Sequence, residues 1–282
     1  MNIKRLIGAV IVLFVIGGVA VWWLVLKDDA PAAVDLTAAA EQLDKDLAVI
    51  DDPADEPTDE PTDDPADEPT DDPADEPADE PAVVEETAAP TSDGGADGID
   101  GTWIIDDEIG SFDFETASGS FAGFRVDEEL VVGAVTAVGR SGGVAGSLTI
   151  SDGELVAAEV VVDMTMIVSN DSRRERAIRR TLDTSAFPTA TFVLAEPVAL
   201  GAGVADGEGV TVQARGDLTV KGITQPVTFS ISAVVRDDDL GVIVGSADIV
   251  WAAFGVSTPS AAIVVSVADE GIVEFQLVVA KP

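Results

Sequence analysis

Apolar and polar residues alternate on both sides of a short turn near the C-terminal end of the chain, in residues 210–235. The apolar or small residues of one face are Val212, Ala214, Gly216, Leu218 and Val220 before the turn, and Val227, Phe229, Ile231 and Ala233 after it. Because successive side chains of a β-strand point to opposite faces, this period of two predicts a hairpin with one buried face. Gly222 supplies the backbone freedom that a tight turn needs, and Pro226 stands near the start of the second strand, where its missing N–H group costs least. This part of the chain is therefore restricted to a sheet.

The charges divide the chain into three parts. Residues 1–27 contain three bases and no acid, residues 28–100 contain 27 acids and one base, and residues 101–282 contain 26 acids and 11 bases. A surface of this sign repels nucleic acid and anionic lipid headgroups. We therefore expect no nucleic-acid partner.

The first part contains an uncharged run of 21 residues, 6–26. This length is sufficient for a helix to cross a hydrocarbon core of about 30 Å. Lys4 and Arg5 precede the run, so residues 1–5 are expected in the cytoplasm and the residues after it on the outer side. The run predicts a single-pass protein of the cell membrane with an extracytoplasmic C-terminal domain.

A cleaved signal peptide is the alternative for the same run. Its apolar core would be shorter, and Trp22 and Trp23 stand at the outer end, where a retained span carries aromatic residues. A lipoprotein is excluded because the chain has no cysteine to acylate. Heavy use of Ala, Val, Gly and Asp, with few Asn and Lys, indicates a GC-rich bacterium.

Residues 27–100 have the composition of a disordered acidic linker. Proline recurs at every fourth position from Pro53 to Pro81, usually after two acidic residues. Residues before proline favour extended conformations, like charges repel, and nothing apolar is available to bury. We expect a stalk between membrane and domain, with a plain solvated tether or diffuse binding of divalent cations as alternatives. A short helix is predicted over residues 35–50, with three leucines roughly on one face: Leu36, Leu43 and Leu47.

Residues 101–282 read as one globular domain, large enough for its own core. The predicted strands cover residues 111–116, 129–138, 144–150, 155–168, 191–194, 210–220, 227–235, 241–250 and 272–279. Many strands at short spacing indicate an antiparallel barrel or a sandwich. One helix interrupts them at residues 172–182, with Ser172 as the predicted N-cap and Glu175 three residues later.

The hairpin sequence G-D-L-T-V-K-G-I-T-Q-P-V, at residues 216–227, resembles the hairpin signature of the YceI-like, polyisoprenoid-binding family. Five further segments are similar to that family in the same order: residues 101–106, 139–150, 173–179, 182–192 and 251–256. Gln225 stands where many members have histidine. The resemblance implies an all-β, lipocalin-like antiparallel barrel of about eight strands with one short capping helix. It also implies an elongated apolar cavity for an isoprenoid lipid, such as a quinone tail or a prenyl phosphate, and no other cofactor.

Two sets of side chains are candidates for contact with such a lipid. The candidates for lining the cavity are Phe112, Phe114, Phe121, Phe187, Phe192 and Phe254. Small inward residues, mostly Val and Ala, would leave room for an aliphatic chain, whereas tight packing around them would give a filled barrel. The filled barrel corresponds to the second function class, a structural or interaction domain displayed on a stalk.

The second set consists of arginines of the predicted helix that could bind a phosphate head group: Arg173, Arg174, Arg176 and Arg180. With Arg179 they make up five of the 11 bases of residues 101–282. Guanidinium groups suit phosphate because they offer paired donors. A solvated helix face that pairs with nearby carboxylates is the alternative.

No catalytic or metal site is predicted. Residues 139–143 fit the G-x-S-x-G pattern of hydrolases, but the chain has no histidine to act as the base. Residues 183–185 resemble the D-T-S of aspartic proteases, but a single copy would need a symmetric homodimer, and a homodimer stays an open option. The absence of His and Cys excludes thiol chemistry and imidazole or thiolate zinc sites. Residues 237–239, three aspartates, are read as a charged hairpin loop rather than a calcium site.

Overall fold

The computed structural model describes residues 30–50 and 98–282, apart from residues 132, 202, 205–206, 237–238 and 259–263. The transmembrane helix predicted at residues 6–26 and the proline repeat at residues 53–81 lie outside this part of the chain. Within the described part, no helix combines the length and the apolar character needed to cross a membrane.

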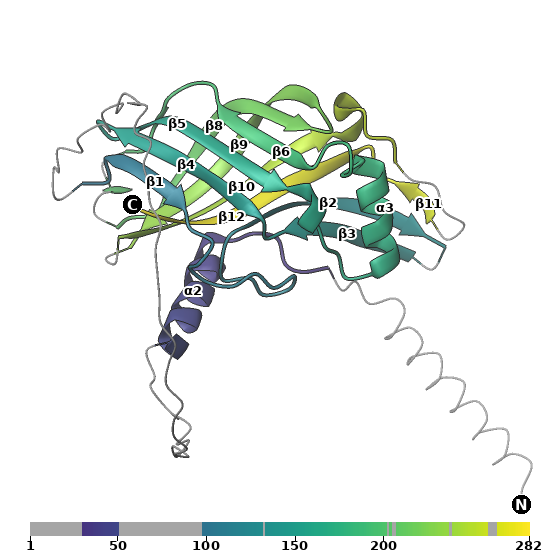
Figure 1. The fold of residues 1–282 in the computed structure, drawn as a ribbon, viewed down its shortest axis with the longest axis horizontal. Helices are drawn as coiled ribbons and strands as arrows, with labels where there is room; N and C mark the ends of the chain where they lie inside the picture. Colours follow the sequence, from purple (N-terminus) through teal and green to yellow (C-terminus); the bar gives the residue numbers. More distant parts are fainter. Residues whose placement is uncertain are drawn as a thin grey trace, which may run out of the picture.

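Eight antiparallel strands close into a barrel (Figure 1). Around the wall they are β1 Gly101–Ile105, β4 Val144–Ser151, β5 Glu154–Asp163, β6 Thr189–Leu194, β8 Val210–Val220, β9 Ile223–Val235, β10 Leu240–Val250 and β12 Glu270–Ala280. The ring closes where Ile104 and Ile105 of β1 pair with Ala280 and Val279 of β12. The predicted all-β antiparallel barrel of about eight strands is confirmed.

Four further strands attach to this ring. The hairpin of β2 (Phe121–Leu130) and β3 (Gly133–Ser141) joins the wall through pairing of β2 with β12, and β11 (Val264–Val267) pairs with β2. The short β7 (Val198–Ala199) pairs with β5. The strand predicted at residues 129–138 corresponds to β3 from Gly133 onward, but its start is wrong, because the turn between β2 and β3 divides it. The strand predicted at residues 111–116 is also wrong, since these residues form part of a loop.

The hairpin predicted in residues 210–235 is formed by β8 and β9, and β9 begins four residues earlier than predicted. Val220 pairs with Ile223, so the turn consists of Lys221 and Gly222, whose φ angles are 52° and 72°. Positive φ at both positions is the geometry of a turn whose twist matches that of the two strands. The predicted inner face is buried, as Leu218 and Phe229 show, and the residues between point to solvent.

Helix α3 (Ser172–Leu182) covers one end of the barrel (Figure 1). Its N-cap is Asp171, whose carboxylate accepts hydrogen bonds from the backbone N–H groups of Arg173 and Arg174 at 2.7 and 3.2 Å. The prediction of Ser172 as the N-cap is wrong by one residue. These hydrogen bonds, that of Arg173 above all, lower the pKa of Asp171 below its ordinary value, against the smaller opposing effect of partial burial.

Helix α2 (Leu36–Ile50) packs on the outside of the barrel, against β9 and β10 (Figure 1). Its buried residues Ala39 and Leu43 form a cluster with the outward-facing side chains of two strands: Val242, Val244 and Val278. The helix predicted over residues 35–50 is confirmed, and the assignment of all of residues 27–100 to a disordered linker is wrong for it. We call residues 30–50 the strap.

A buried ion pair fixes the start of the strap to the barrel. The guanidinium of Arg140 donates to Glu274 Oε1 from Nη2 at 2.8 Å and from Nε at 3.2 Å, and the Glu274 side chain is 1% exposed. The same Arg140 Nη2 donates to the carbonyl oxygen of Ala32 at 2.7 Å, and Arg125 Nη1 donates to that of Pro31 at 2.8 Å. A buried charge is tolerated only when it is paired and hydrogen-bonded, so the pair and the strap depend on each other.

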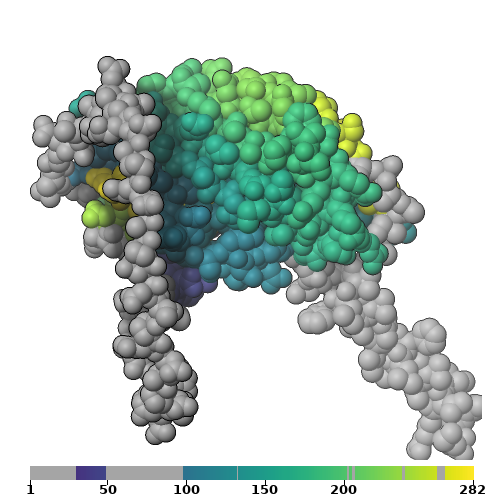
Figure 2. Space-filling model, in the orientation of Figure 1, coloured from purple at the N-terminus to yellow at the C-terminus, as the bar shows by residue number. Residues whose placement is uncertain are grey.

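The loop of residues 106–120 completes this outer layer. Ser118 Oγ donates to Asp46 Oδ2 of α2 at 2.6 Å, and the Gln276 amide donates to the carbonyl oxygen of Gly119 at 2.9 Å. In Figure 2 the purple strap and the blue residues of the loop lie next to each other below the barrel wall. In this part of the wall the outer face is thus covered by the strap and the loop, while the inner face borders the barrel interior.

Candidate functional site

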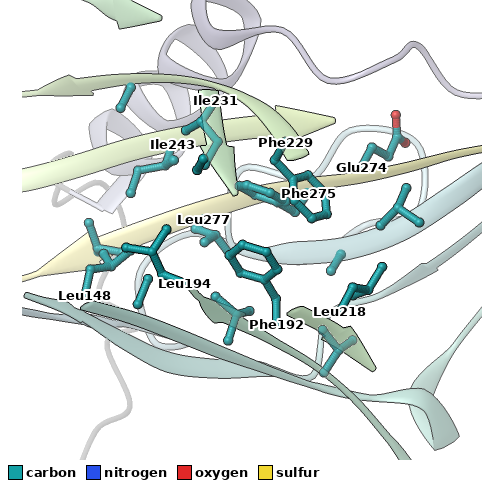
Figure 3. A pocket seen from close by; sticks show the side chains of 18 of the residues that line it. Leu148, Phe192, Leu194, Leu218, Phe229, Ile231, Ile243, Glu274, Phe275 and Leu277 are labelled. Carbon is teal, nitrogen blue, oxygen red and sulfur yellow. The ribbon is translucent and has the colours of Figure 1, made fainter. Parts of the chain in front are cut away.

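The inward faces of the strands enclose an apolar cavity (Figure 3). Its volume is about 170 Å³, counted as the space in which the centre of a water molecule can lie. One water needs roughly 10–15 Å³ on this measure, so the cavity is large, but water also needs two to four polar partners there. The walls provide almost none, and the cavity suits an apolar guest.

Period-two alternation produces these walls. The lining side chains include Leu148, Ala158, Val160, Ala190, Phe192, Leu194, Val212, Ala214, Leu218, Phe229, Ile231, Ile243, Phe275 and Leu277. Ala158, Ala190 and Ala214 are small, and this leaves space inside an eight-stranded ring that larger residues would fill. The fully packed interior that the sequence left open is not what the structure has.

Three phenylalanine rings meet in the cavity, from β6, β9 and β12 (Figure 3). The Phe192 and Phe229 rings are 5.1 Å apart at 81°, and the Phe229 and Phe275 rings are 5.4 Å apart at 57°. Gly216 and Gly245 make room for two of the rings, because a Cβ atom at either position would lie within 2.4 Å of the Phe192 or Phe275 ring. The site therefore depends on glycine as well as on aromatic residues.

Of the six phenylalanines predicted to line the cavity, Phe192 does so. The prediction is wrong for the other five. Phe121 faces outward, where it packs near Phe112 and under Arg140. Phe114 lies in the loop of residues 106–120, where its carbonyl oxygen accepts from Arg140. The last two lie near α3: Phe187 is exposed, and Phe254 is buried in the core beside the helix.

Sequence reasoning missed Phe124, Phe229 and Phe275 as lining residues. The signal for two of them was present, because Phe229 and Phe275 occupy the inward parity of strands with clear alternation. Choosing phenylalanines by that parity, rather than by their nearness to family-like segments, would have found them.

The arginines of α3 lie on its outer side and at its ends. Arg173, Arg176 and Arg180 are exposed and border neither described cavity. Arg174 Nη2 lies 3.5 Å from Glu128 Oε2, and its Nη1 donates to Asn170 Oδ1 at 2.5 Å. All four arginines predicted to bind a head group thus lie in solvent or, for Arg174, next to a carboxyl and an amide group, and the structure does not bring the four together.

A smaller apolar cavity of about 70 Å³ lies beneath α3. Phe124, Leu182 and Trp251 border both cavities and separate them. Trp251 begins the 3₁₀ helix η3 (Trp251–Phe254), and its indole Nε1 is buried with no hydrogen-bond partner among the described residues. The two cavities and this N–H group form the candidate site.

Neither enzyme-like pattern forms a reactive site. Ser141 Oγ donates to the carbonyl oxygen of Asp163 at 2.6 Å, at the end of β3, so G-x-S-x-G is part of a strand. Asp183 is the left-handed C-cap of α3, with a φ of 52°. The Thr165 hydroxyl, and then its backbone N–H, lower the pKa of Asp163, which lies outside both cavities. Among the described residues, no group of three or more potential ligands comes close enough together to hold a metal ion.

Comparisons with known proteins identify a family and several similar structures. The model of the YceI-like domain family matches residues 114–279. A polyisoprenoid-binding domain from Saccharophagus degradans, implicated in plant cell wall breakdown, is 18% identical, with a TM-score of 0.47 over 58% of this chain and 94% of that one. BcnA from Burkholderia cenocepacia is 21% identical, with a TM-score of 0.45 over 56% of this chain and 95% of that one.

The YCEI protein of Campylobacter jejuni is 12% identical, with a TM-score of 0.40 over 51% of this chain and 85% of that one. No curated protein matches the chain. The family match covers more than half of the sequence and includes every strand of the ring except β1 and the last residue of β12. The chain therefore belongs to the YceI-like domain family, whose members are binding proteins and not enzymes.

Proposed function

We propose that the protein is a membrane-tethered, extracytoplasmic binding protein that holds an isoprenoid-type lipid in the barrel cavity. The observation that carries the proposal is the cavity itself, a space of about 170 Å³ whose walls are almost entirely apolar. An eight-stranded barrel of this kind has room for one small ligand. Polyisoprenoid binding in the similar domain from Saccharophagus degradans is consistent with the proposal.

The lining chemistry favours a long hydrocarbon chain over a compact polar ligand. Glu274 touches the cavity wall, but its carboxylate is bound by Arg140 on the outer side. Trp103 Nε1 donates to the carbonyl oxygen of Ile99 at 2.9 Å, so it is not available to a ligand. Burying a polar ligand group without a partner is costly, whereas each buried CH₂ group contributes about 0.8 kcal/mol. An isoprenoid chain is apolar along its length and flexible enough to follow the lumen.

The strap alters the expected role of residues 51–97. These residues connect the end of α2 with β1, and both elements pack on the same barrel. Their length therefore does not set the distance between the barrel and an anchor at residues 6–26. Only residues 27–29 separate that anchor from the strap, so we replace the stalk by a short tether that keeps the barrel at the membrane surface.

Lipid binding is tested with the full chain purified in detergent, extracted with organic solvent and analysed by mass spectrometry. A matched pair of variants uses neighbours on β8: Ala214→Phe fills the cavity, and Gln213→Phe places the same ring on the exposed outer face. We expect a prenyl lipid from the native chain and from Gln213→Phe, and much less from Ala214→Phe. The absence of any isoprenoid, or equal amounts from both variants, would refute the proposal.

Tethering is tested separately in intact cells. Because the chain has no cysteine, a single Ser151→Cys variant carries one thiol, at the exposed last residue of β4. We expect a membrane-impermeant maleimide to label it, and we expect the protein to stay in the membrane after alkaline carbonate. Release by carbonate, or labelling only after lysis, would contradict the tether.

A further inference from the structure

Trp251 lies inside the barrel at the end that α3 covers. The residue is 7% exposed, and its ring meets that of Phe124 edge-on, with 5.4 Å between the centroids. Gly271 leaves the space that the indole occupies, since a Cβ atom there would lie 2.2 Å from the ring. Because Trp251 borders the main cavity and the cavity beneath α3, a ligand that extends from one into the other must pass it.

The Trp251 N–H group lacks the acceptor that a buried indole normally has. Its Nε1 atom is buried and makes no hydrogen bond within the described part of the chain. Buried tryptophan N–H groups usually find a partner, because an unsatisfied donor is costly. Trp103, the other tryptophan that borders the main cavity, shows the usual arrangement, with its N–H bonded to Ile99. The contrast marks the Trp251 N–H as a donor whose partner comes from outside the described chain.

Among the described residues, one other buried side-chain atom lacks a partner, Arg179 Nε. Its guanidinium is already engaged, because Nη2 donates to the carbonyl oxygen of Ile167 at 3.0 Å and lies 3.1 Å from Glu175 Oε1. Arg179 borders neither cavity. Of these two donors, only the Trp251 N–H group can therefore bind an acceptor on a ligand in the cavities.

The chemistry of the cavity beneath α3 limits what this acceptor can be. The charged residues that border it are Glu128 and Arg174, which lie 3.5 Å apart and compensate each other. Strong binding of phosphate takes several charge-assisted hydrogen bonds, and an unmatched buried charge is costly. One free N–H group, on a residue that borders the same cavity as this matched ion pair, suits a single uncharged oxygen atom.

We infer that the ligand ends in an uncharged oxygen, a hydroxyl or a carbonyl group, which accepts a hydrogen bond from Trp251 Nε1 where the two cavities adjoin. The isoprenoid tail then runs along the main cavity toward Leu200 and Val204, at the opposite end. The inference rests on the proposed lipid binding and narrows its ligand class to prenyl alcohols and prenylquinones. Prenyl pyrophosphates, and with them a head-group role for the α3 arginines, are disfavoured.

The test measures equilibrium binding of three probes with one tail to the full chain in detergent: geranylgeraniol, geranylgeranyl pyrophosphate and the corresponding hydrocarbon. Trp251→Phe removes the donor and keeps an aromatic ring, so we expect the affinity for the alcohol to fall about 5- to 100-fold. Affinity for the hydrocarbon should change by less than about twofold, because phenylalanine keeps an apolar ring in contact with the chain and single apolar atom contacts contribute little. Trp103→Phe is the matched control, because its donor is bonded within the chain and its loss should not distinguish the probes.

Three outcomes overturn the inference: equal losses for alcohol and hydrocarbon, no loss for the alcohol, or tighter binding of the pyrophosphate than of the alcohol. If none of the probes binds, the proposed lipid binding itself fails, which is a different result. An indole ¹⁵N–¹H spectrum of the native chain gives a second readout that needs no variant. The Trp251 N–H resonance should move downfield with the alcohol or a prenylquinone but not with the hydrocarbon, and equal shifts with all ligands also overturn the inference.

Discussion

Truncation of Leu43 tests whether the strap is part of the folded domain. The side chain is 0% exposed and packs between Ala39 and the outer faces of β10 and β12. Leu43→Ala therefore leaves a cavity between a helix and a sheet. Such truncations cost about 2–5 kcal/mol, and less where a neighbouring element can move into the gap. Because α2 can shift toward the wall while the closed barrel cannot, we expect about 2–3 kcal/mol, from the lower half of that range.

The assay is urea unfolding of the full chain in detergent, followed by tryptophan fluorescence. The control is Lys45→Ala, an exposed position of the same helix, which we expect to change the free energy of unfolding by less than about 0.5 kcal/mol. If Leu43→Ala matched this control, the strap would not fold cooperatively with the barrel. The same conclusion would follow if the variant only exposed residues 30–50 to protease while the barrel kept its unfolding midpoint.

Three further substitutions test individual contacts of the fold. Glu274→Ala leaves the buried Arg140 guanidinium without its carboxylate and should lower the free energy of unfolding, measured by thermal denaturation, by about 3–5 kcal/mol. Replacing both residues by apolar ones should lower it by less. Equal losses of stability in the single and the double variant would contradict the pairing. Gly222→Val places a β-branched residue at a φ of 72° and should cost about 1–3 kcal/mol, and an unchanged melting temperature would show that the turn can rearrange. Asp171→Ala removes the N-cap of α3 and should cost about 0.5–2 kcal/mol at pH 7, whereas Asp171→Asn should retain most of the cap. The pKa of Asp171 is lower in the folded protein than in the unfolded chain, so the stabilisation by its charge is complete above the unfolded-state pKa and is lost as the pH falls through the folded-state pKa. A difference in unfolding free energy between the native chain and Asp171→Ala that stays the same in acid would contradict this cause.

The alternation of apolar and polar residues predicted the barrel well because most strands have one solvent-exposed face and one buried face. In β8 the outward residues are exposed and the inward residues are buried, and the sequence shows the same period. Alternation failed where both faces of a strand are covered. Phe121 and Phe124 of β2 point to opposite sides, one under the loop of residues 106–120 and one into the barrel. Both environments favour aromatic residues, so composition alone could not decide which ring lines the cavity.

The strap was only partly predictable for a related reason. Its leucines identified α2 as an amphipathic helix, but its acidic outer face resembles the linker that follows it. The surface that receives α2 carries Val242, Val244 and Val278 on the outer faces of β10 and β12. Around these positions, at residues 242–244 and 277–280, apolar residues follow one another without alternation. Such a run indicates a strand segment buried on both faces, but it does not identify the element that covers the outer face. The pairing of Arg140 with Glu274 joins residues 134 positions apart and has no local signature.

The strap and the cavity are related by position. The first strap residues bind Arg125 and Arg140, and Arg140 also pairs with Val168, four residues before α3 begins. The start of the strap therefore lies beside the end of the barrel that holds Trp251. If residues 6–26 cross the membrane, the short tether brings this end, rather than the end at Leu200, close to the bilayer. A lipid whose oxygen lies at the membrane interface would then enter tail first past Trp251, and its oxygen would come to rest at the indole N–H without the lipid having to turn inside the barrel.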